Sequence, residues 1–236
     1  WQPILSRKSG YIQSVDNAGL LRVARDRKSI VRMAHGIGEF VVENTTLVSL
    51  ALDEPLDKEI IAELQETFSI SRYRTIEQDA GFGIRQIVDV ALKALSPGIN
   101  DTTTAVTCVD YLTAILARLA YRQIPSSFRY EEGELRVIAI GPSFVSLLSE
   151  AFNQIRESAK GNLAVILGML GALQTIASLT ADPSRRQALH EQVEWIAELA
   201  ARTLESSHDR ICFERQLGQV REALKTAPVL SIHKSE

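Results

Sequence analysis

Six charged residues lie near a sharp corner in the middle of the chain, and the three arginines among them could hold an anion. They are Arg72, Arg74, Asp79, Arg85, Asp89 and Asp110, and the corner is SPGIND, residues 96–101. Guanidinium groups bind oxoanions through paired N–H donors, and the first amides of a helix that starts near residue 101 would add further donors. The same charges could instead pair with one another in a buried network. Two interpretations follow: a structural ion network, or a ligand-binding or catalytic site around Arg74, Arg85, Asp89, Asn100 and Asp101.

Turn and helix-capping roles are enough to account for the residues of the corner, with no catalytic function. Pro97 disfavours helical geometry at Ser96 and should end the preceding helix. Gly98 would supply the positive φ that a helix exit often requires, and Asn100 and Asp101 are both suited to cap the next helix. The segment therefore predicts a hairpin of two helices.

The order of Arg85 and Asp89 is informative. The two residues are four positions apart on the first expected helix, beside its apolar stripe. An exposed pair is more favourable when the acidic residue comes first. We therefore expect Arg85 and Asp89 to meet groups from other parts of the fold.

Apolar spacing predicts the elements that position these residues. A stripe with helical period runs through residues 80–95, and another runs through residues 102–122. Asp57 is expected to cap a helix that reaches Phe68. A short strand is expected at residues 135–140, followed by a helix opened by Gly141 and Pro142, an uncharged helix, a helix from Pro183 and a last helix.

The segment before residue 52 has the composition of β structure. GYIQSVD, LLRVA, SIVRMA and EFVVE contain strand formers and are separated by turn-favouring residues. Asn44 stands where a left-handed turn is expected. The predicted fold class is α+β, mainly α. We expect a small β-barrel-like module at 1–52, a helical bundle domain at 53–228 and a flexible tail at 229–236.

Charge is distributed unevenly along a chain whose net charge is −3. The segment up to Arg32 holds seven basic residues and two acidic ones, whereas the rest holds 19 basic and 27 acidic ones. A basic segment of this kind suits an anionic surface such as lipid headgroups. The expected membrane-surface patch is Arg7, Lys8, Arg22, Arg25, Arg27, Lys28 and Arg32. The stretch from Arg22 to Arg32 has no aromatic residue interleaved and therefore does not favour nucleic acid.

One segment resembles a membrane span. Residues 161–181 contain no charged side chain, but polar residues dilute the run and amphipathic helices flank it. We interpret it as the central helix of a soluble bundle. Cys108 and Cys212 are far apart and are expected to be free buried thiols in a reducing compartment.

No catalytic or metal-binding motif is present. His190 and Glu194 lack the second histidine of a zinc-protease motif. Ser207, His208 and Asp209 are consecutive, so their side chains diverge and cannot form a triad. The sequence predicts no catalytic residues, no metal and no cofactor.

The region QDAGFGIRQIVDVALKALSPGINDTTTAVTCVDYL resembles the signature of a bacterial family known as domain of unknown function 2254. The matching motifs are Q-D-x-x-F-G-x-R-Q, the A-L-S-P-G-I-N-D corner, and a following T-A and C-x-D. The family usually has Pro after N-D, whereas this chain has Thr102. The resemblance implies a membrane protein whose transmembrane helices precede this region.

The resemblance and the basic segment together set the functional expectation. The chain is expected to be the soluble, cytoplasmic C-terminal part of a bacterial inner-membrane protein, with Trp1 near the bilayer. It would serve as an assembly or regulatory module with a link to transport, packed as a homo-oligomer. An enzymatic role is not favoured.

Overall fold

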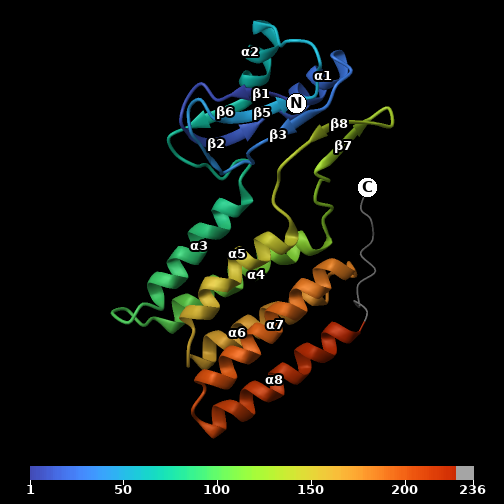
Figure 1. Ribbon diagram of the computed structural model, residues 1–236. Helices are drawn as coiled ribbons and strands as arrows, with labels where there is room; N and C mark the ends of the chain where they lie inside the picture. The colour runs from blue at the N-terminus through green and yellow to red at the C-terminus, as the bar shows by residue number, and fades with distance from the viewer. Residues whose placement is uncertain (227–236) are drawn as a thin grey trace. The chain divides into compact units, whose positions relative to one another are not determined.

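The computed structural model describes residues 1–226. It is a mixed α+β structure that is 55% helical, which confirms the mainly helical class. The chain forms two compact units (Figure 1). Unit 1 comprises Trp1–Gly83 and Pro125–Pro142, and unit 2 comprises Ile84–Ile124 and the chain from Ser143 onward. The expected tail at 229–236 lies outside the described residues.

Unit 1 is built on two sheets. The five-stranded sheet has the order β1-β5-β3-β8-β7, and the three-stranded sheet has the order β4-β2-β6. The strands are β1 (Gln2–Leu5), β2 (Gly10–Val15), β3 (Val31–Met33), β4 (Phe40–Val41), β5 (Thr46–Leu50), β6 (Phe68–Ser71), β7 (Phe128–Glu131) and β8 (Glu134–Ile138). β3 and β8 run parallel, and the other neighbouring strands are antiparallel. Strand β8 confirms the expected strand near residue 135.

The expected β-barrel is wrong. Each sheet ends in open edges, at β1 and β7 in one and at β4 and β6 in the other, so neither closes on itself. The pairing of β3 with β8 explains the difference, because it extends the larger sheet with a strand from a distant part of the sequence. A barrel formed by residues 1–52 alone would not include that strand.

The expected strand LLRVA is also wrong, because it lies in helix α1 (Asn17–Asp26). Asp16 caps this helix by accepting from the amide of Gly19. Leu20, Val23 and Ala24 are buried, and their i, i+3, i+4 spacing suits one helix face. The expected strand EFVVE is reduced to the two residues of β4. Helix α2 (Lys58–Glu66) is capped by Asp57 as predicted.

Unit 2 is a helical bundle, and residues 53–83 and 125–142 of the expected helical domain belong to unit 1 instead. Its helices are α3 (Ala80–Ala94, within the unit from Ile84), α4 (Thr102–Tyr121), α5 (Phe144–Ser158), α6 (Leu163–Ala177), α7 (Pro183–Thr203) and α8 (Ser207–Lys225). The uncharged helix α6 packs against α4, α5, α7 and α8. Eight of its fifteen residues are buried, so it forms the interior of the bundle, as its sequence suggested.

The corner between α3 and α4 forms where it was predicted, with a different residue in the strained position. Helix α3 ends at Ala94, before Pro97, and Asp101 caps α4 by accepting from the amide of Thr104. Asn100 carries the positive φ, +49°, so the expectation for Gly98 is wrong. Asparagine tolerates this conformation better than other residues with a side chain. The hydroxyl of Thr102 accepts a hydrogen bond from Asn162, which caps α6.

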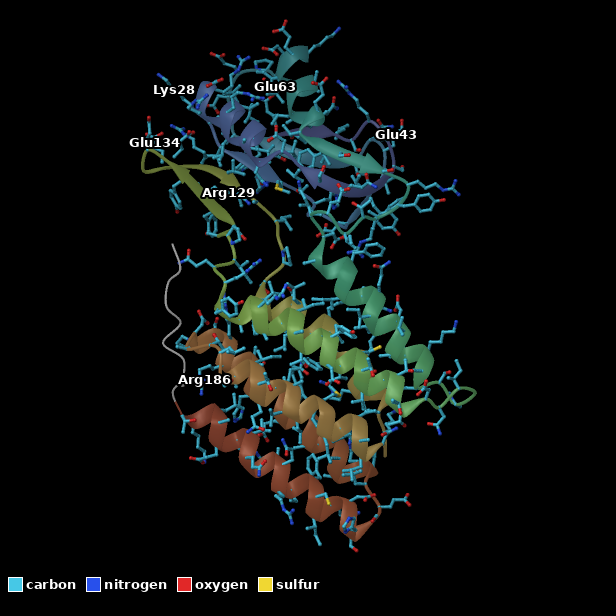
Figure 2. All side chains as sticks on the ribbon, turned by 180° about the vertical axis from the view of Figure 1, so that it is seen from behind. Lys28, Glu43, Glu63, Arg129, Glu134 and Arg186 are labelled. Atoms are coloured by element: carbon cyan, nitrogen blue, oxygen red, sulfur yellow. The ribbon has the colours of Figure 1, made fainter. Side chains whose placement is uncertain are left out.

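Two consecutive arginines tie the helix ends together. Arg185 donates to the carbonyls of Leu119, Ala120 and Arg122 at the end of α4. Arg186, labelled in Figure 2, donates to five carbonyls at the ends of α6 and α8. The last carbonyls of a helix have no partner within it and carry partial negative charge. The first turn of α7 therefore caps three other helices.

Candidate functional site

The charged residues that the sequence singled out fall into both units. Arg72, Arg74 and Asp79 belong to unit 1, and Arg85, Asp89, Asn100, Asp101 and Asp110 belong to unit 2. Each group is described within its own unit.

In unit 1, Arg74 and Asp79 form a close ion pair. Nε of Arg74 donates to Oδ2 of Asp79 at 2.9 Å, and Nη2 of Arg74 lies 2.7 Å from the same oxygen. The Asp79 carboxylate is buried and also accepts from the amide of Phe82 at 2.9 Å, in the first turn of α3. The Arg74 guanidinium lies 4.9 Å from the centre of the Phe82 ring. The pair therefore anchors the start of α3.

The loop between β3 and β4 closes over this ion pair. Gly38 has φ +85°, and a Cβ there would lie 2.3 Å from Oδ2 of Asp79 and 2.6 Å from Nη2 of Arg74. Its amide donates to the carbonyl of Ile12 on β2. Gln78 accepts from the amide of Val15, also on β2. Within unit 1, these motif residues hold the helix start against the small sheet.

In unit 2, Arg85 binds two carboxylates. Its Nη2 lies 2.8 Å from Oδ1 of Asp89, and its Nη1 lies 3.5 Å from Oε1 of Glu150 on α5. The contact with α5 is the kind of long-range partner expected for Arg85. The side chains of Arg85 and Asp89 are 33% and 56% exposed, so this is a partly solvated cluster rather than a buried one.

The remaining expected residues do not join Arg85. Arg85 lies nine positions before the end of α3 at Ala94, which at 1.5 Å per residue places it about 14 Å from the corner along the helix. The Asp101 carboxylate is already bound by the Thr104 hydroxyl and amide, which lower its pKa. Asp110 is exposed on α4, and Arg72 lies over the Tyr73 ring in unit 1. Within unit 2, the corner and Arg85 are separate features.

The basic segment near the N-terminus is interspersed with acids. Arg22 pairs with Glu63, Arg25 with Asp26 and Glu131, and Arg27 with Asp57. Arg32 lies 4.3 Å from the centre of the Trp1 ring, and Arg7, Lys8 and Lys28 are exposed. Figure 2 shows Lys28 with Glu63 and Glu134 in the same unit. Unit 1 as a whole holds 12 basic and 15 acidic residues.

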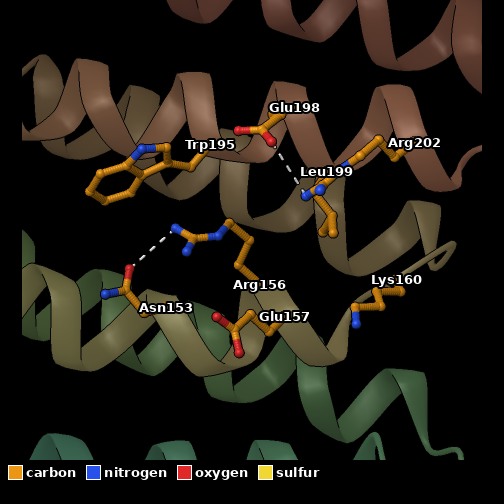
Figure 3. A pocket seen from close by; sticks show the side chains of 8 residues that line it. All are labelled: Asn153, Arg156, Glu157, Lys160, Trp195, Glu198, Leu199 and Arg202. Atoms are coloured by element: carbon orange, nitrogen blue, oxygen red, sulfur yellow. Dashed lines mark hydrogen bonds and ion pairs between the residues drawn. The ribbon is translucent and has the colours of Figure 1, made fainter.

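One hollow in unit 2 was not predicted. A hollow of about 370 Å³ lies between α5 and α7 (Figure 3). The two faces that line it have the same helical spacing, i, i+3, i+4 and i+7. They are Asn153, Arg156, Glu157 and Lys160 on one side, and Trp195, Glu198, Leu199 and Arg202 on the other. Lys160 and Arg202 also border a second hollow of about 590 Å³.

Arg156 is held in this hollow by neutral groups. Its Nη1 donates to Oδ1 of Asn153 at 3.2 Å and to Oε1 of Gln192 at 3.1 Å. Gln192 is 1% exposed and donates to the same Asn153 oxygen at 2.9 Å. Trp195 is 41% exposed, and its ring centre lies 5.1 Å from the guanidinium carbon. Burial lowers the pKa of Arg156, although Glu157 and Glu198 partly oppose this effect.

No sequence motif marks this cluster. Trp195 is 41% exposed although it follows buried neighbours on α7, and this partial exposure is visible only in the structure. The pairing of Arg156 with Gln192 joins residues 36 positions apart. Only the packing of α5 on α7 brings them together.

The thiols and metal-binding residue types add no second site. Both cysteines are free; Cys108 is buried, with its pKa raised by that burial, and Cys212 is half-buried. Within residues 1–226, no group of three or more His, Cys, Asp or Glu side chains is arranged to hold a metal ion.

Comparison with known proteins decides the family. The family described as "Predicted membrane protein (DUF2254)" matches residues 1–175. The chain belongs to this family. The match confirms the resemblance carried by the QDAGFG and SPGIND motifs. No solved structure matches the chain.

Curated relatives of this family member are found in mycobacteria. Uncharacterised proteins of Mycobacterium bovis and of Mycobacterium tuberculosis strain H37Rv are each 32% identical to it over 214 residues. The alignments cover 88% of this chain and 41% of each relative. The chain therefore spans about two-fifths of the length of the curated relatives it matches.

One helix in the described part of the chain, α4, is long and apolar enough to cross a membrane. A third of its most apolar window is buried inside the structure. Core helices of soluble bundles satisfy the same criteria, and α4 packs along α6. Length and composition alone therefore do not make α4 a membrane span.

Proposed function

We propose that this family member forms the extramembrane, cytoplasmic part of a bacterial inner-membrane protein and serves as an assembly or regulatory module. The observation that carries the proposal is the family match, because the family is described as a membrane protein and its relatives are more than twice as long as this chain. The spans would lie in the part of those relatives that this chain does not cover.

The enclosure of α6 supports an extramembrane role for unit 2. The most apolar segment of the chain is surrounded by other helices of the unit. A helix whose buried residues already face protein has little apolar surface left for lipid. The bundle therefore has an interior of the kind found in water-soluble domains.

The exposed basic residues of unit 1 support a position beside anionic headgroups. Arg7, Lys8 and Lys28 are exposed, and the ion pairs of Arg22, Arg25 and Arg27 are solvated and therefore weak. A basic surface near a bilayer is attracted by about 1 kcal/mol per residue. Unit 1 carries more acids than bases, so this attraction would depend on orientation.

Cysteine accessibility in the full-length Mycobacterium tuberculosis relative tests the topology. A cysteine would be introduced at the position that aligns with Glu132, in the turn between β7 and β8. A membrane-impermeant maleimide should label it only after the cells are permeabilised. Labelling in intact spheroplasts at the same rate as an extracellular control cysteine would contradict the proposed side of the membrane.

The alternative, an anion-binding or catalytic site around Arg74, Arg85, Asp89, Asn100 and Asp101, is less well supported. Arg74 already binds Asp79, and Arg85 already binds Asp89 and Glu150. Each arginine thus has a carboxylate partner inside its own unit. We therefore assign these residues structural roles in the proposal.

A further inference from the structure

The hollow between α5 and α7 contains a cation with no carboxylate partner in the described chain. Arg156 is partly buried, and its hydrogen-bond acceptors in that part of the chain are the amide oxygens of Asn153 and Gln192. No carboxylate within residues 1–226 lies within 4.0 Å of its guanidinium nitrogens. Removing a cation from water is unfavourable unless a counter-charge replaces the lost hydration. Arg156 therefore has no carboxylate in direct contact, and Glu157 and Glu198 attract it only from farther away in the same hollow.

The hydrogen bonds of Arg156 leave one edge of the guanidinium available. Both bonds to the amide oxygens are made by Nη1. Nε and Nη2 have no acceptor in the described chain, yet neither is among the atoms buried away from solvent. These two N–H groups form the fork that binds two oxygens of one oxoanion side by side.

The fork is fixed in direction before any ligand arrives. Gln192 is buried and bonds both Arg156 and Asn153, so the three side chains form a closed network. The Trp195 ring restricts the guanidinium further, and Figure 3 shows Arg156 in the space between α5 and α7. A held arginine loses less conformational entropy on binding than a free one.

Two further cations lie at the other end of the same hollow. Lys160 and Arg202 line it, and both also border the adjoining hollow. Arg202 has Glu198 at 3.6 Å, in a pair that is mostly exposed and therefore weak. Three cations and two acids, Glu157 and Glu198, give the lining a net positive charge.

We propose that this hollow binds a phosphate group, with the Nε and Nη2 edge of Arg156 donating to two of its oxygens and Lys160 and Arg202 supplying further positive charge. The binding site lies within unit 2. A phosphate-binding activity is separate from the membrane role proposed above. The group would come from a free phosphate or phosphomonoester, or from an anionic lipid headgroup.

Tryptophan fluorescence offers a direct test, because the chain has two tryptophans. In a Trp1→Phe background, emission comes from Trp195 alone, which lies against Arg156. Titration with inorganic phosphate should change this emission saturably, and sodium chloride at matched ionic strength should not. An identical response to chloride would overturn the proposal.

Two substitutions and one matched control locate the site. Arg156→Gln should weaken phosphate binding by about tenfold or more, because a charge-assisted pair of hydrogen bonds is lost. Lys160→Gln, at an exposed position, should weaken phosphate binding by a smaller factor. Arg215→Gln, at an exposed position on α8 outside the hollow, should leave binding unchanged. The site would be refuted if Lys160→Gln and Arg215→Gln weakened phosphate binding equally. It would also be refuted if Arg156→Gln and Lys160→Gln both left phosphate binding unchanged.

Sedimentation with vesicles separates the two sources of the group. Vesicles of phosphatidylcholine with phosphatidic acid should compete with free phosphate in an Arg156-dependent way if a lipid headgroup is the ligand. Saturable binding of free phosphate without vesicle binding would assign the site to a soluble phosphate compound. Absence of both would overturn the proposal.

Discussion

At the scale of single residues, the buried carboxylate of Asp79 has three structural tasks. It accepts from the first turn of α3, it binds Arg74 through two nitrogens, and it lies against Gly38. Burying a carboxylate is tolerated only while these partners remain, because losing one of them leaves a buried charge without compensation. Gln78 and Asp79, the QD of the sequence motif, therefore have structural roles in the folding of unit 1.

Replacing Asp79 by Asn should destabilise unit 1 by about 2–4 kcal/mol, because Arg74 would lose its counter-charge in a largely buried position. Urea unfolding followed by Trp1 fluorescence in a Trp195→Phe background would measure the change. Asp26→Asn removes an exposed partner of Arg25 in the same unit and should cost less than about 1 kcal/mol. Equal losses for the two variants would contradict the role of Asp79.

Gly38→Ala should be more damaging than a surface substitution. The new Cβ would lie 2.3 Å from the Asp79 carboxylate, in a backbone conformation that side chains rarely adopt. We expect a loss of about 2 kcal/mol or more, measured by thermal unfolding. Gly83→Ala is the matched control: it lies in helix α3, and no atom lies within 4 Å of the position that its new methyl group would occupy. This control should be neutral or stabilising by up to about 1 kcal/mol.

The helix caps predict a dependence of stability on pH. Thr104 lowers the pKa of Asp101, and Ser184 and the Arg185 amide lower that of Asp182. Unfolded carboxyls titrate near about pH 4. The stabilisation by both caps is therefore complete above that pH and is lost as the pH falls through the lower folded pKa values.

Asp101→Asn keeps an oxygen that can accept from the Thr104 amide but removes the titrating charge. Its unfolding free energy should fall less than that of the wild type between about pH 4 and pH 2. Chemical denaturation at several pH values would show this. Parallel curves for the variant and the wild type would mean that the Asp101 cap does not contribute to the pH dependence.

At the scale of elements, the first turn of α7 connects the ends of three other helices. Arg185 and Arg186 follow Asp182 and Pro183, which fix where α7 begins. The two guanidinium groups then cap α4, α6 and α8 by donating to their terminal carbonyls. The bundle is thus fastened by side chains as well as by its apolar core.

Arg186→Met should destabilise unit 2 by about 2–4 kcal/mol, because five carbonyls lose a charged donor while the apolar stem is retained. Arg186→Lys should recover only part of the loss, since one ammonium cannot reach carbonyls on two helices as a planar fork does. Trp195 fluorescence during urea unfolding would report on this unit. A loss for Arg186→Met no larger than that for Arg215→Met would contradict the prediction.

At the scale of the whole molecule, α4 leaves a continuous face exposed within its unit. Thr103, Thr107, Tyr111, Ala114 and Tyr121 follow one another along that face and are exposed. Thr103, Thr107 and Ala114 are small and would allow another helix to approach closely, and Tyr111 and Tyr121 add exposed aromatic surface beside them. We propose that this surface contacts a second copy if the chain acts as an assembly module.

Ala114→Arg should therefore prevent self-association of the purified chain. Sedimentation velocity over a range of concentrations should show a concentration-dependent oligomer for the wild type and a monomer for this variant. Gln219→Arg, at an exposed position on α8, should associate as the wild type does. A wild type that stays monomeric at high concentration would contradict the assembly role.

The sequence alone determined the features that depend on neighbouring residues. Helical periodicity located α3, α4 and the interior helix α6, and the side chains of Asp57 and Asp101 marked two helix starts. These features are local, because a cap or an apolar stripe involves residues only a few positions apart. The segment LLRVA was predicted as a strand from its composition and forms part of helix α1. Strand propensity is weak and depends on context, whereas the i, i+3, i+4 spacing of Leu20, Val23 and Ala24 places them on one buried helix face.

Tertiary structure decided what depends on distant partners. The pairing of β3 with β8 opened the expected barrel, and the approach of Gly38 to Asp79 required a loop and a helix start from separate segments. The Arg156 network likewise formed only when α5 packed on α7. A side chain shows what chemistry it can perform, but the packing of whole elements decides which other side chains it meets and how much water remains between them.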